Sequence, residues 1–301
     1  MFVEVVQGKT IKVMKNKIIT IILVLALLVG VGLLLYPVVS NVLHDRKKDT
    51  ILTEYNEGIA NLSESSQDKI RAEAEKYNRK LMGTVIISDP FDPDYADDMD
   101  ESYVSALNPD GTGIMAYIEI PRIKVYEPVY HGTSEETLAK GAGHLANTSL
   151  PVGGMGTHAV ITGHTGLPDA EMFNKLDTLK EDDIFYIHVL GETLAYQVDQ
   201  MKVVEPSDVS DLYINAEKDY VTLITCTPYG VNSHRLLVRG TRVSYTKEVQ
   251  EIAAAQQSEG AGTENWKKIY GVAIAKGIGL AVVILLIVIV IDRCVKQKKT
   301  K

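Results

Sequence analysis

A run of 22 uncharged, mostly apolar residues near the N-terminus, residues 18–39, constrains this chain more than any other feature. A helix of that length rises about 33 Å, which is enough to cross the hydrocarbon core of a bilayer. The run is longer than the apolar part of a signal peptide, the rival interpretation, and no clear Ala-x-Ala cleavage site follows it. We therefore expect a retained membrane helix. Residues 270–291 form a second run of 22 residues that contains Lys276, and a buried core helix is its alternative.

Charge is distributed unevenly along the chain. The net charge is −8, but residues 1–17 carry +3 and residues 292–301 carry +4, which leaves −15 for the remainder. Because basic residues flank membrane spans on the cytoplasmic side, both termini are expected in the cytoplasm and residues 40–268 outside the cell. The acidic middle argues against nucleic acid as a partner.

This topology gives the two cysteines different surroundings. Cys294 follows the second apolar run on the cytoplasmic side, so it cannot pair with Cys226. The external domain then holds one unpaired thiol in a potentially oxidising compartment. Such a thiol indicates either an intermolecular bond or a functional cysteine.

Cys226 lies in a strand–loop–strand pattern. Residues 221–225 are apolar and β-branched, Pro228 begins a turn, and residues 236–238 form a second apolar strand that Arg235 opens. Paired neighbouring strands would bring Cys226 and Arg235 together at their shared end, where the guanidinium favours the nucleophilic thiolate. The alternative is a small buried cysteine in a core strand.

A thiol nucleophile needs a partner that takes its proton and returns one to the leaving group. His164 is the distinctive candidate because it lies at the end of an apolar strand at 159–162 and precedes a Gly-Leu-Pro turn. It therefore lies at a strand-to-loop edge, as Cys226 does. His144 and His158 remain alternatives at this point.

Strand signals recur at short spacing across the middle of the chain, which indicates a β-barrel or sandwich of seven or eight strands. Short helices are expected at 134–140, capped by Ser134, and at 170–176. Two longer helices within 40–83 should pack on this β domain. The strands are expected at the two segments around Cys226 and at 114–120, 123–129, 158–162, 184–189 and 193–204.

An acidic loop separates the helices from the β domain. Residues 88–100 contain six aspartates and two prolines, which exclude both a helix and a central strand. The segment is either a solvated linker or a loop that lays Asp89 and Phe91 over a positively charged, thiol-bearing cleft. No spacing of metal ligands and no glycine-rich phosphate loop stands out, so no metal or cofactor is expected.

Three motifs together resemble the class C sortases, the pilin-polymerising members of a family of membrane-anchored cysteine transpeptidases of Gram-positive bacteria. Residues 223–240, with Cys226-Thr-Pro-Tyr-Gly and Arg235, look like the family's active-site signature. Thr162-Gly-His164 resembles its histidine motif. Asp89-Pro90-Phe91 resembles the class C lid, and a second membrane span also fits that class.

The resemblance implies a mainly β fold, an eight-stranded sortase β-barrel with short helices. N-terminal helices and a lid loop would precede it, and two transmembrane helices would flank it. It implies that Cys226 attacks the Thr–Gly bond of a Leu-Pro-x-Thr-Gly (LPXTG)-like sorting signal and forms a thioester. His164 would protonate the departing amine, and Arg235 would hydrogen-bond the substrate carbonyl. Asp89, Pro90 and Phe91 would form the lid.

The implied partners are pilins or surface proteins that carry the sorting signal. The amine nucleophile would be a pilin lysine or a cell-wall precursor. The closest alternative is a sortase that anchors single proteins to the cell wall. A non-catalytic surface binding module and a hydrolytic cysteine peptidase are further alternatives.

The expected organisation of the chain follows from these assignments. Its parts are a basic cytoplasmic N-terminus at 1–17, transmembrane helix 1 at 18–39, external helices at 40–83, a lid-bearing loop at 84–112, the catalytic barrel at 113–246, a juxtamembrane linker at 247–269, transmembrane helix 2 at 270–291 and a basic cytoplasmic tail at 292–301.

Overall fold

The structure is a computed structural model of the 301-residue chain. It describes residues 2–81, 87–92, 99–109, 111–166 and 172–262, together with 272, 275–279 and 281. The chain divides into two compact units, one formed by residues 1–40 and 264–301 and the other by residues 41–263. The second unit contains all the strands of the described residues.

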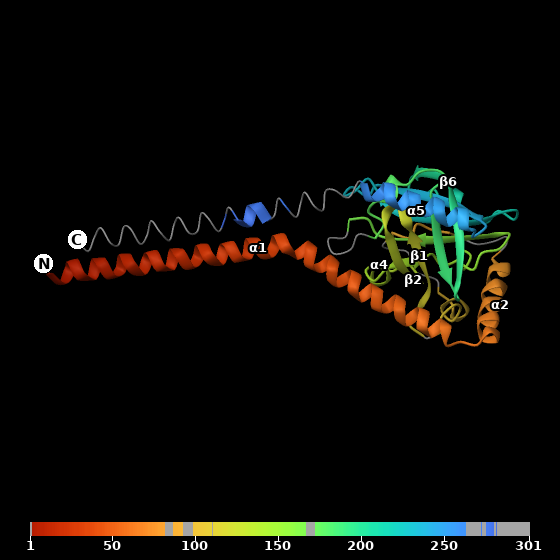
Figure 1. The fold of residues 1–301 in the computed structure, drawn as a ribbon, viewed down its shortest axis with the longest axis horizontal. Helices are drawn as coiled ribbons and strands as arrows, with labels where there is room; N and C mark the ends of the chain where they lie inside the picture. Colours follow the sequence, from red (N-terminus) through yellow and green to blue (C-terminus); the bar gives the residue numbers. More distant parts are fainter. Residues whose placement is uncertain are drawn as a thin grey trace. The chain divides into compact units, whose positions relative to one another are not determined.

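Eight strands close into a barrel in the order β1-β2-β3-β4-β7-β8-β6-β5. Figure 1 labels β1, β2 and β6 of this barrel. Two neighbouring pairs, β2 with β3 and β4 with β7, are parallel, and the other pairs are antiparallel. The predicted eight-stranded barrel is therefore confirmed, and the sandwich alternative is wrong. The strands are β1 (Ile114–Ile120), β2 (Val125–His131), β3 (Ala142–His144), β4 (Thr157–Thr162), β5 (Ile184–Val189), β6 (Glu192–Val204), β7 (Asp219–Thr227) and β8 (His234–Val243).

The strand that the sequence pattern missed is β3. It has three residues and no β-branched side chain, so propensity gives no signal for it. Gly143 pairs with Tyr130 of β2, and a Cβ placed there would lie 2.3 Å from the carbonyl oxygen of Gly132. Close backbone approach thus selects glycine at this position.

Two long helices are packed against the barrel, as expected. In α1 (Phe2–Ala60), Tyr55 and Ile59 are buried in the main core cluster. In α2 (Glu64–Lys80), the buried Asn78 side chain donates to the carbonyl of Leu150 at 3.0 Å and accepts from its amide at 2.7 Å. These paired bonds fix α2 to the barrel loop.

The remaining helices are short or follow the barrel. The helix expected at 134–140 is α4 (Glu135–Leu138), capped by Ser134. The helix expected at 170–176 falls partly outside the described residues, and residues 172–175 form a turn that leads into η2 (Leu176–Thr178). The others are α3 (Glu101–Val104), η1 (Pro121–Ile123), η3 (Ser210–Leu212) and α5 (Lys247–Gly262).

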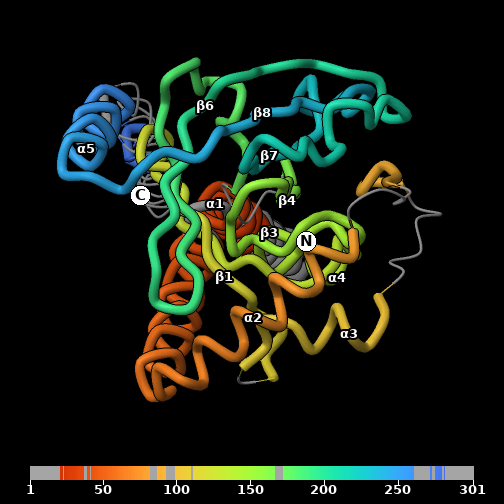
Figure 2. Tube along the Cα trace, turned by 90° about the vertical axis from the view of Figure 1, so that its right-hand side faces the viewer, coloured from red at the N-terminus to blue at the C-terminus, as the bar shows by residue number. Residues whose placement is uncertain are grey.

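Helix α5 occupies most of the segment expected to be a juxtamembrane linker. Its Ala253 is buried against β5 and β6, and Gln256 accepts the amide of Ile184 at 2.9 Å and donates to the carbonyl of Asp182 at 3.0 Å. Figure 2 shows α2 and α5 at separate places on the outside of the barrel. The chain is thus held to the barrel for some twenty residues beyond β8.

The structure describes one of the two expected membrane spans and little of the other. Residues 18–39 lie within α1, and residues 270–291 fall largely outside the described residues. In the part of the chain that the structure describes, none of the helices meets the length and apolarity required of a membrane span.

Candidate functional site

Cys226 and Arg235 lie directly opposite each other on two neighbouring strands. The antiparallel register of β7 and β8 pairs Cys226 with Arg235, one residue before β7 ends and one after β8 begins. The connecting loop turns at Pro228, whose carbonyl accepts the amides of Val231 and Asn232. The hairpin expected from the sequence therefore forms, and it sets the thiol beside the guanidinium at one rim of the barrel.

His164 reaches the same rim from β4, the parallel neighbour of β7. Thr162 pairs with Ile224, and the Gly163 amide donates to the Ile224 carbonyl at 3.0 Å. His164 and Cys226 each lie two residues beyond this pair. Because parallel strands run in the same direction, both residues lie at the same end of the barrel. A Cβ on Gly163 would lie 2.7 Å from the buried ring of Phe173, which explains the glycine that precedes the histidine.

His144 and His158, the two alternative candidates, are buried and have polar contacts inside the barrel. His144 is fully buried, its Nε2 lies 2.8 Å from the carbonyl of Ser149, and burial lowers its pKa to about 4. His158 is also buried and contacts Thr222 at 2.7 Å, and burial lowers its pKa to about 4 as well. Both imidazoles are therefore neutral at physiological pH and engaged within the barrel wall. His164, with 16% of its side chain exposed, remains accessible at the rim.

The segment at 87–92 covers this rim. The Asp89 carboxylate accepts two hydrogen bonds from Arg235, from Nε at 2.8 Å and from Nη2 at 2.6 Å. The Phe91 ring centroid lies 5.1 Å from the Arg235 Cζ and 5.8 Å from the His164 ring centroid. Pro90 between them is buried. Of the two interpretations of the acidic loop, the geometry matches the one in which Asp89 and Phe91 lie over the charged cleft.

Arg235 has almost no hydrogen-bonding capacity left in this arrangement. Besides the two bonds to Asp89, its Nη1 donates to the carbonyls of Asn232 and His234, each at 3.1 Å. A guanidinium has five N–H groups, so these contacts use four of them. A further carbonyl ligand would gain full access to Arg235 only after Asp89 leaves.

The Cys226 thiol is nearly buried, at 9% exposure, and this controls its ionisation. Burial raises the pKa of the thiol, the Arg235 guanidinium lowers it, and the carboxylates of Asp89 and Glu135 raise it, with a net increase. The expectation that the guanidinium favours the thiolate is correct in direction, but burial outweighs it. The thiol is therefore protonated at neutral pH in this arrangement.

Glu135 is a residue at this site that no sequence pattern singled out. It opens α4, and its Oε2 lies 3.5 Å from the His164 Nε2. Its helix was predicted from the Ser134 cap, but nothing in the sequence connected that helix to the end of β4. The parallel pairing of β2 with β3 and the position of α4 between them bring the carboxylate to the rim.

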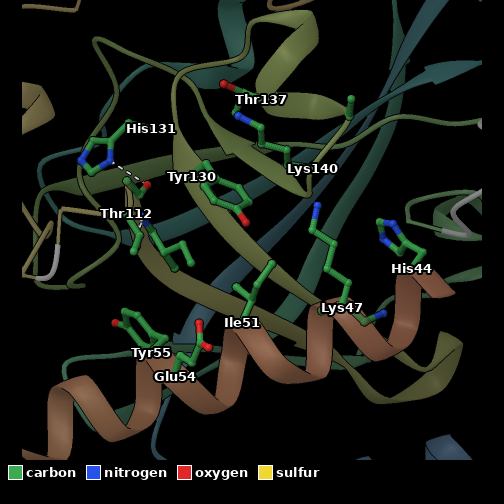
Figure 3. A pocket seen from close by; sticks show the side chains of 14 residues that line it. His44, Lys47, Ile51, Glu54, Tyr55, Thr112, Tyr130, His131, Thr137 and Lys140 are labelled. Carbon is green, nitrogen blue, oxygen red and sulfur yellow. Dashed lines mark hydrogen bonds between the residues drawn. The ribbon is translucent and has the colours of Figure 1, made fainter.

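A separate cavity of ≈ 440 Å³ lies between α1 and the barrel (Figure 3). His44, Lys47 and Ile51 line it from α1, and Tyr130 and Lys140 line it from the barrel side. Neither Cys226, His164 nor Arg235 contributes to its wall. Within the described residues, no group of three or more His, Cys, Asp or Glu side chains could hold a metal ion.

Comparison with known proteins gives a consistent result. A family model described as "Sortase domain" matches residues 118–243, which span β1 to β8. Sortase A of Staphylococcus aureus is 28% identical over 218 residues, which cover 71% of this chain and 88% of that protein.

Solved structures are more similar. Sortase C-1 from Actinomyces oris is 49% identical with a TM-score of 0.57, and the match covers 60% of this chain and 99% of that chain. Streptococcus pneumoniae sortase C, in a structure said to give insight into catalysis and pilin substrate specificity, is 45% identical with a TM-score of 0.61, over 66% and 98% of the two chains. A "pilus-related" sortase C of Group B Streptococcus is 42% identical with a TM-score of 0.59, over 64% and 97%.

The electrostatics of the thiol predict how its alkylation responds to pH. Asp89→Asn removes a negative charge that opposes the thiolate, so the pH midpoint of Cys226 alkylation should fall. Arg235→Gln removes the favourable cation, so the midpoint should rise. The measurement is the iodoacetamide reaction rate against pH in a Cys294→Ser background, with Asp92→Asn as a control that removes a nearby charge but not the paired hydrogen bonds. An unchanged or higher midpoint in Asp89→Asn would contradict this account.

Proposed function

Because this chain belongs to the sortase family of cysteine transpeptidases, we propose that it cleaves an LPXTG-like sorting signal between Thr and Gly and transfers the acyl group to an amine. The main support for the proposal is the geometry of three residues at one rim of the barrel. Cys226 and Arg235 are register partners at the rim where β4, the parallel neighbour of β7, delivers His164. A nucleophile, a proton carrier and a carbonyl-binding cation therefore share one edge of the barrel.

The first half-reaction uses all three groups. The Cys226 thiolate attacks the threonine carbonyl carbon, and Arg235 donates a hydrogen bond to the oxygen on which negative charge develops. The C–N bond to glycine then breaks, and His164 gives its proton to the departing amine. The product on the protein is a thioester between Cys226 and the threonine.

The second half-reaction reverses the proton transfer. The incoming amine loses a proton to His164 and attacks the thioester carbonyl, and the C–S bond breaks to return the Cys226 thiolate. If the amine is a pilin lysine, the product is an isopeptide bond, and repeated transfer builds a polymer. The similarity to sortases C, one of them pilus-related and another described with pilin substrates, supports a pilin lysine over a cell-wall amine.

We further propose that Asp89, Pro90 and Phe91 act as a lid. In the closed arrangement Asp89 occupies the guanidinium that the substrate carbonyl needs, and Phe91 lies against both Arg235 and His164. The hydrogen bonds between Asp89 and Arg235 are charge-assisted because both groups are ionised. They are also largely shielded from water, because each side chain is only about a tenth exposed. Opening would expose the thiol, free two N–H groups of Arg235 and lower the cost of forming the thiolate.

The proposed location is the cell membrane, with two transmembrane helices at 18–39 and 270–291, both termini in the cytoplasm and the barrel outside. The uncharged run at 18–39 and the basic ends support this placement. Large apolar side chains such as Ile21, Leu25 and Leu28 are more than half exposed on α1, which fits a lipid-facing surface.

Thioester formation is the direct test of the proposed reaction. After incubation with a sorting-signal peptide, intact-protein mass spectrometry should show an acyl adduct on Cys226, and Cys226→Ala should show none. His164→Ala should lower the rate of acylation at least about 100-fold, in line with the loss of a general acid. Release of free peptide acid in preference to transfer to an added amine would indicate a hydrolytic peptidase. Complete absence of the adduct, even with Asp89 and Phe91 both replaced by alanine, would favour a binding module.

The lid proposal predicts faster labelling of the thiol. One hydrogen bond to a charged group contributes about 1.5–3 kcal/mol. Replacing both Asp89 and Phe91 by alanine should therefore raise the rate of Cys226 labelling at pH 7 by about 10–100-fold, measured in a Cys294→Ser background. Asp92→Ala, which alters the same segment without removing the Arg235 bonds, is the matched control. Equal labelling rates in the double variant and the unaltered chain would refute the lid.

The proposed topology predicts one-sided labelling in intact cells. In a Cys226→Ala background, a cysteine placed at the exposed Ser258 of α5 should react with a membrane-impermeant maleimide. Cys294 should react only after the cells are permeabilised. Labelling of Cys294 in intact cells would overturn the cytoplasmic placement of the C-terminus.

A further inference from the structure

The Glu135 carboxylate faces the candidate proton carrier without being enclosed. Its Oε2 lies 3.5 Å from the Nε2 of His164, yet 91% of the Glu135 side chain is exposed. The Ser134 Oγ accepts the amide of Thr137 at 3.2 Å and so fixes the start of α4, from which Glu135 projects. A carboxylate that lies beside the imidazole and still faces solvent is able to contact a molecule that approaches from outside.

The charge balance of the rim changes when the lid opens. In the closed arrangement Asp89 neutralises Arg235. Once Asp89 leaves, Arg235 presents an uncompensated cation beside the thioester. An acceptor amine is protonated at neutral pH, because the pKa of a lysine side chain is about 10.4. The acceptor therefore approaches as a cation, and Arg235 repels it.

Glu135 supplies the opposite charge at the place where the amine must lose its proton. We propose that the Glu135 carboxylate binds the ammonium group of the acceptor, holds it within reach of His164 and so selects cationic primary amines over water and neutral nucleophiles. The ammonium N–H groups donate to the Glu135 oxygens. One proton of the ammonium group passes to solvent, which frees the nitrogen lone pair to attack the thioester carbonyl. A second proton passes to the His164 Nε2 as the C–S bond breaks and Cys226 leaves as the thiolate. This role rests on the transpeptidation proposed above.

The neighbouring residue provides a matched control. Glu136 lies on the same short helix and is 82% exposed, but its carboxylate pairs with Lys140 at 2.7 Å. Glu136→Gln therefore removes the same charge from the same element without altering the contact with His164. A difference between the two variants reports the position of the Glu135 carboxylate, not the net charge of the domain.

The experiment measures how the Cys226 thioester partitions between acceptors. The full chain is acylated with a sorting-signal peptide and offered a lysine-containing peptide, hydroxylamine or water, and the products are separated by mass spectrometry. In Glu135→Gln we expect the KM for the lysine peptide to rise about 2–5-fold, the range of an exposed ion pair. The KM for hydroxylamine, which is neutral, should not change, and Glu136→Gln should behave as the unaltered chain.

Other outcomes decide against the proposal. An equal loss with hydroxylamine and with the lysine peptide would mean that Glu135 only positions His164. An unchanged KM for the lysine peptide would mean that the carboxylate does not contact the acceptor. If the unaltered chain forms no thioester, the proposed function itself fails. If it forms one and Glu135→Gln transfers normally, only the role of Glu135 fails.

Discussion

The parallel pairing of β4 with β7 is the constraint on which the site depends. Only two neighbouring strand pairs of the barrel are parallel, and this one makes the strands that carry His164 and Cys226 end at the same rim. The antiparallel turn into β8 then returns the chain to the same rim and adds Arg235. His164, which lies more than 60 positions before Cys226 and Arg235, thus meets them through backbone hydrogen bonds, with the side chains placed by register.

Arg235 takes part both in the covered arrangement of the site and in the proposed chemistry. Its four hydrogen bonds to Asp89, Asn232 and His234 stabilise the covered arrangement. The guanidinium that would stabilise a developing oxyanion is therefore the one that the carboxylate of Asp89 engages. Burial and the negative charge of Asp89 also raise the pKa of the Cys226 thiol. Displacement of Asp89 would lower the pKa of the Cys226 thiol and would also free the Arg235 guanidinium to bind a carbonyl. Access to the site and reactivity of the thiol would therefore change together.

The sequence predicted most of the barrel because strand patterns and turn residues are local signals. β1 and β5 have the predicted bounds, whereas β3 was missed because its three residues are selected by close backbone contact at Gly143. The hairpin around Cys226 was predictable from its two apolar strands and its proline. The contact between Asp89 and Arg235 was one of two open interpretations, because a pair 146 positions apart leaves no local pattern. Glu135 was missed for the same reason.

Asp89 and Glu135, two acidic residues near the rim, contact different partners and differ in how exposed their side chains are. Asp89 is about a tenth exposed and bound to Arg235, so its charge is already matched within the protein. Glu135 is almost fully exposed, and it contacts an imidazole whose charge, in the proposed reaction, depends on the step. A transpeptidase must bind an acyl donor through a carbonyl and an acceptor through an ammonium group. Under the proposed function, the shielded cation on one side of the thiol and the exposed anion on the histidine side would provide these two binding functions, and the proposed lid would block the donor side while the acceptor side keeps its charge.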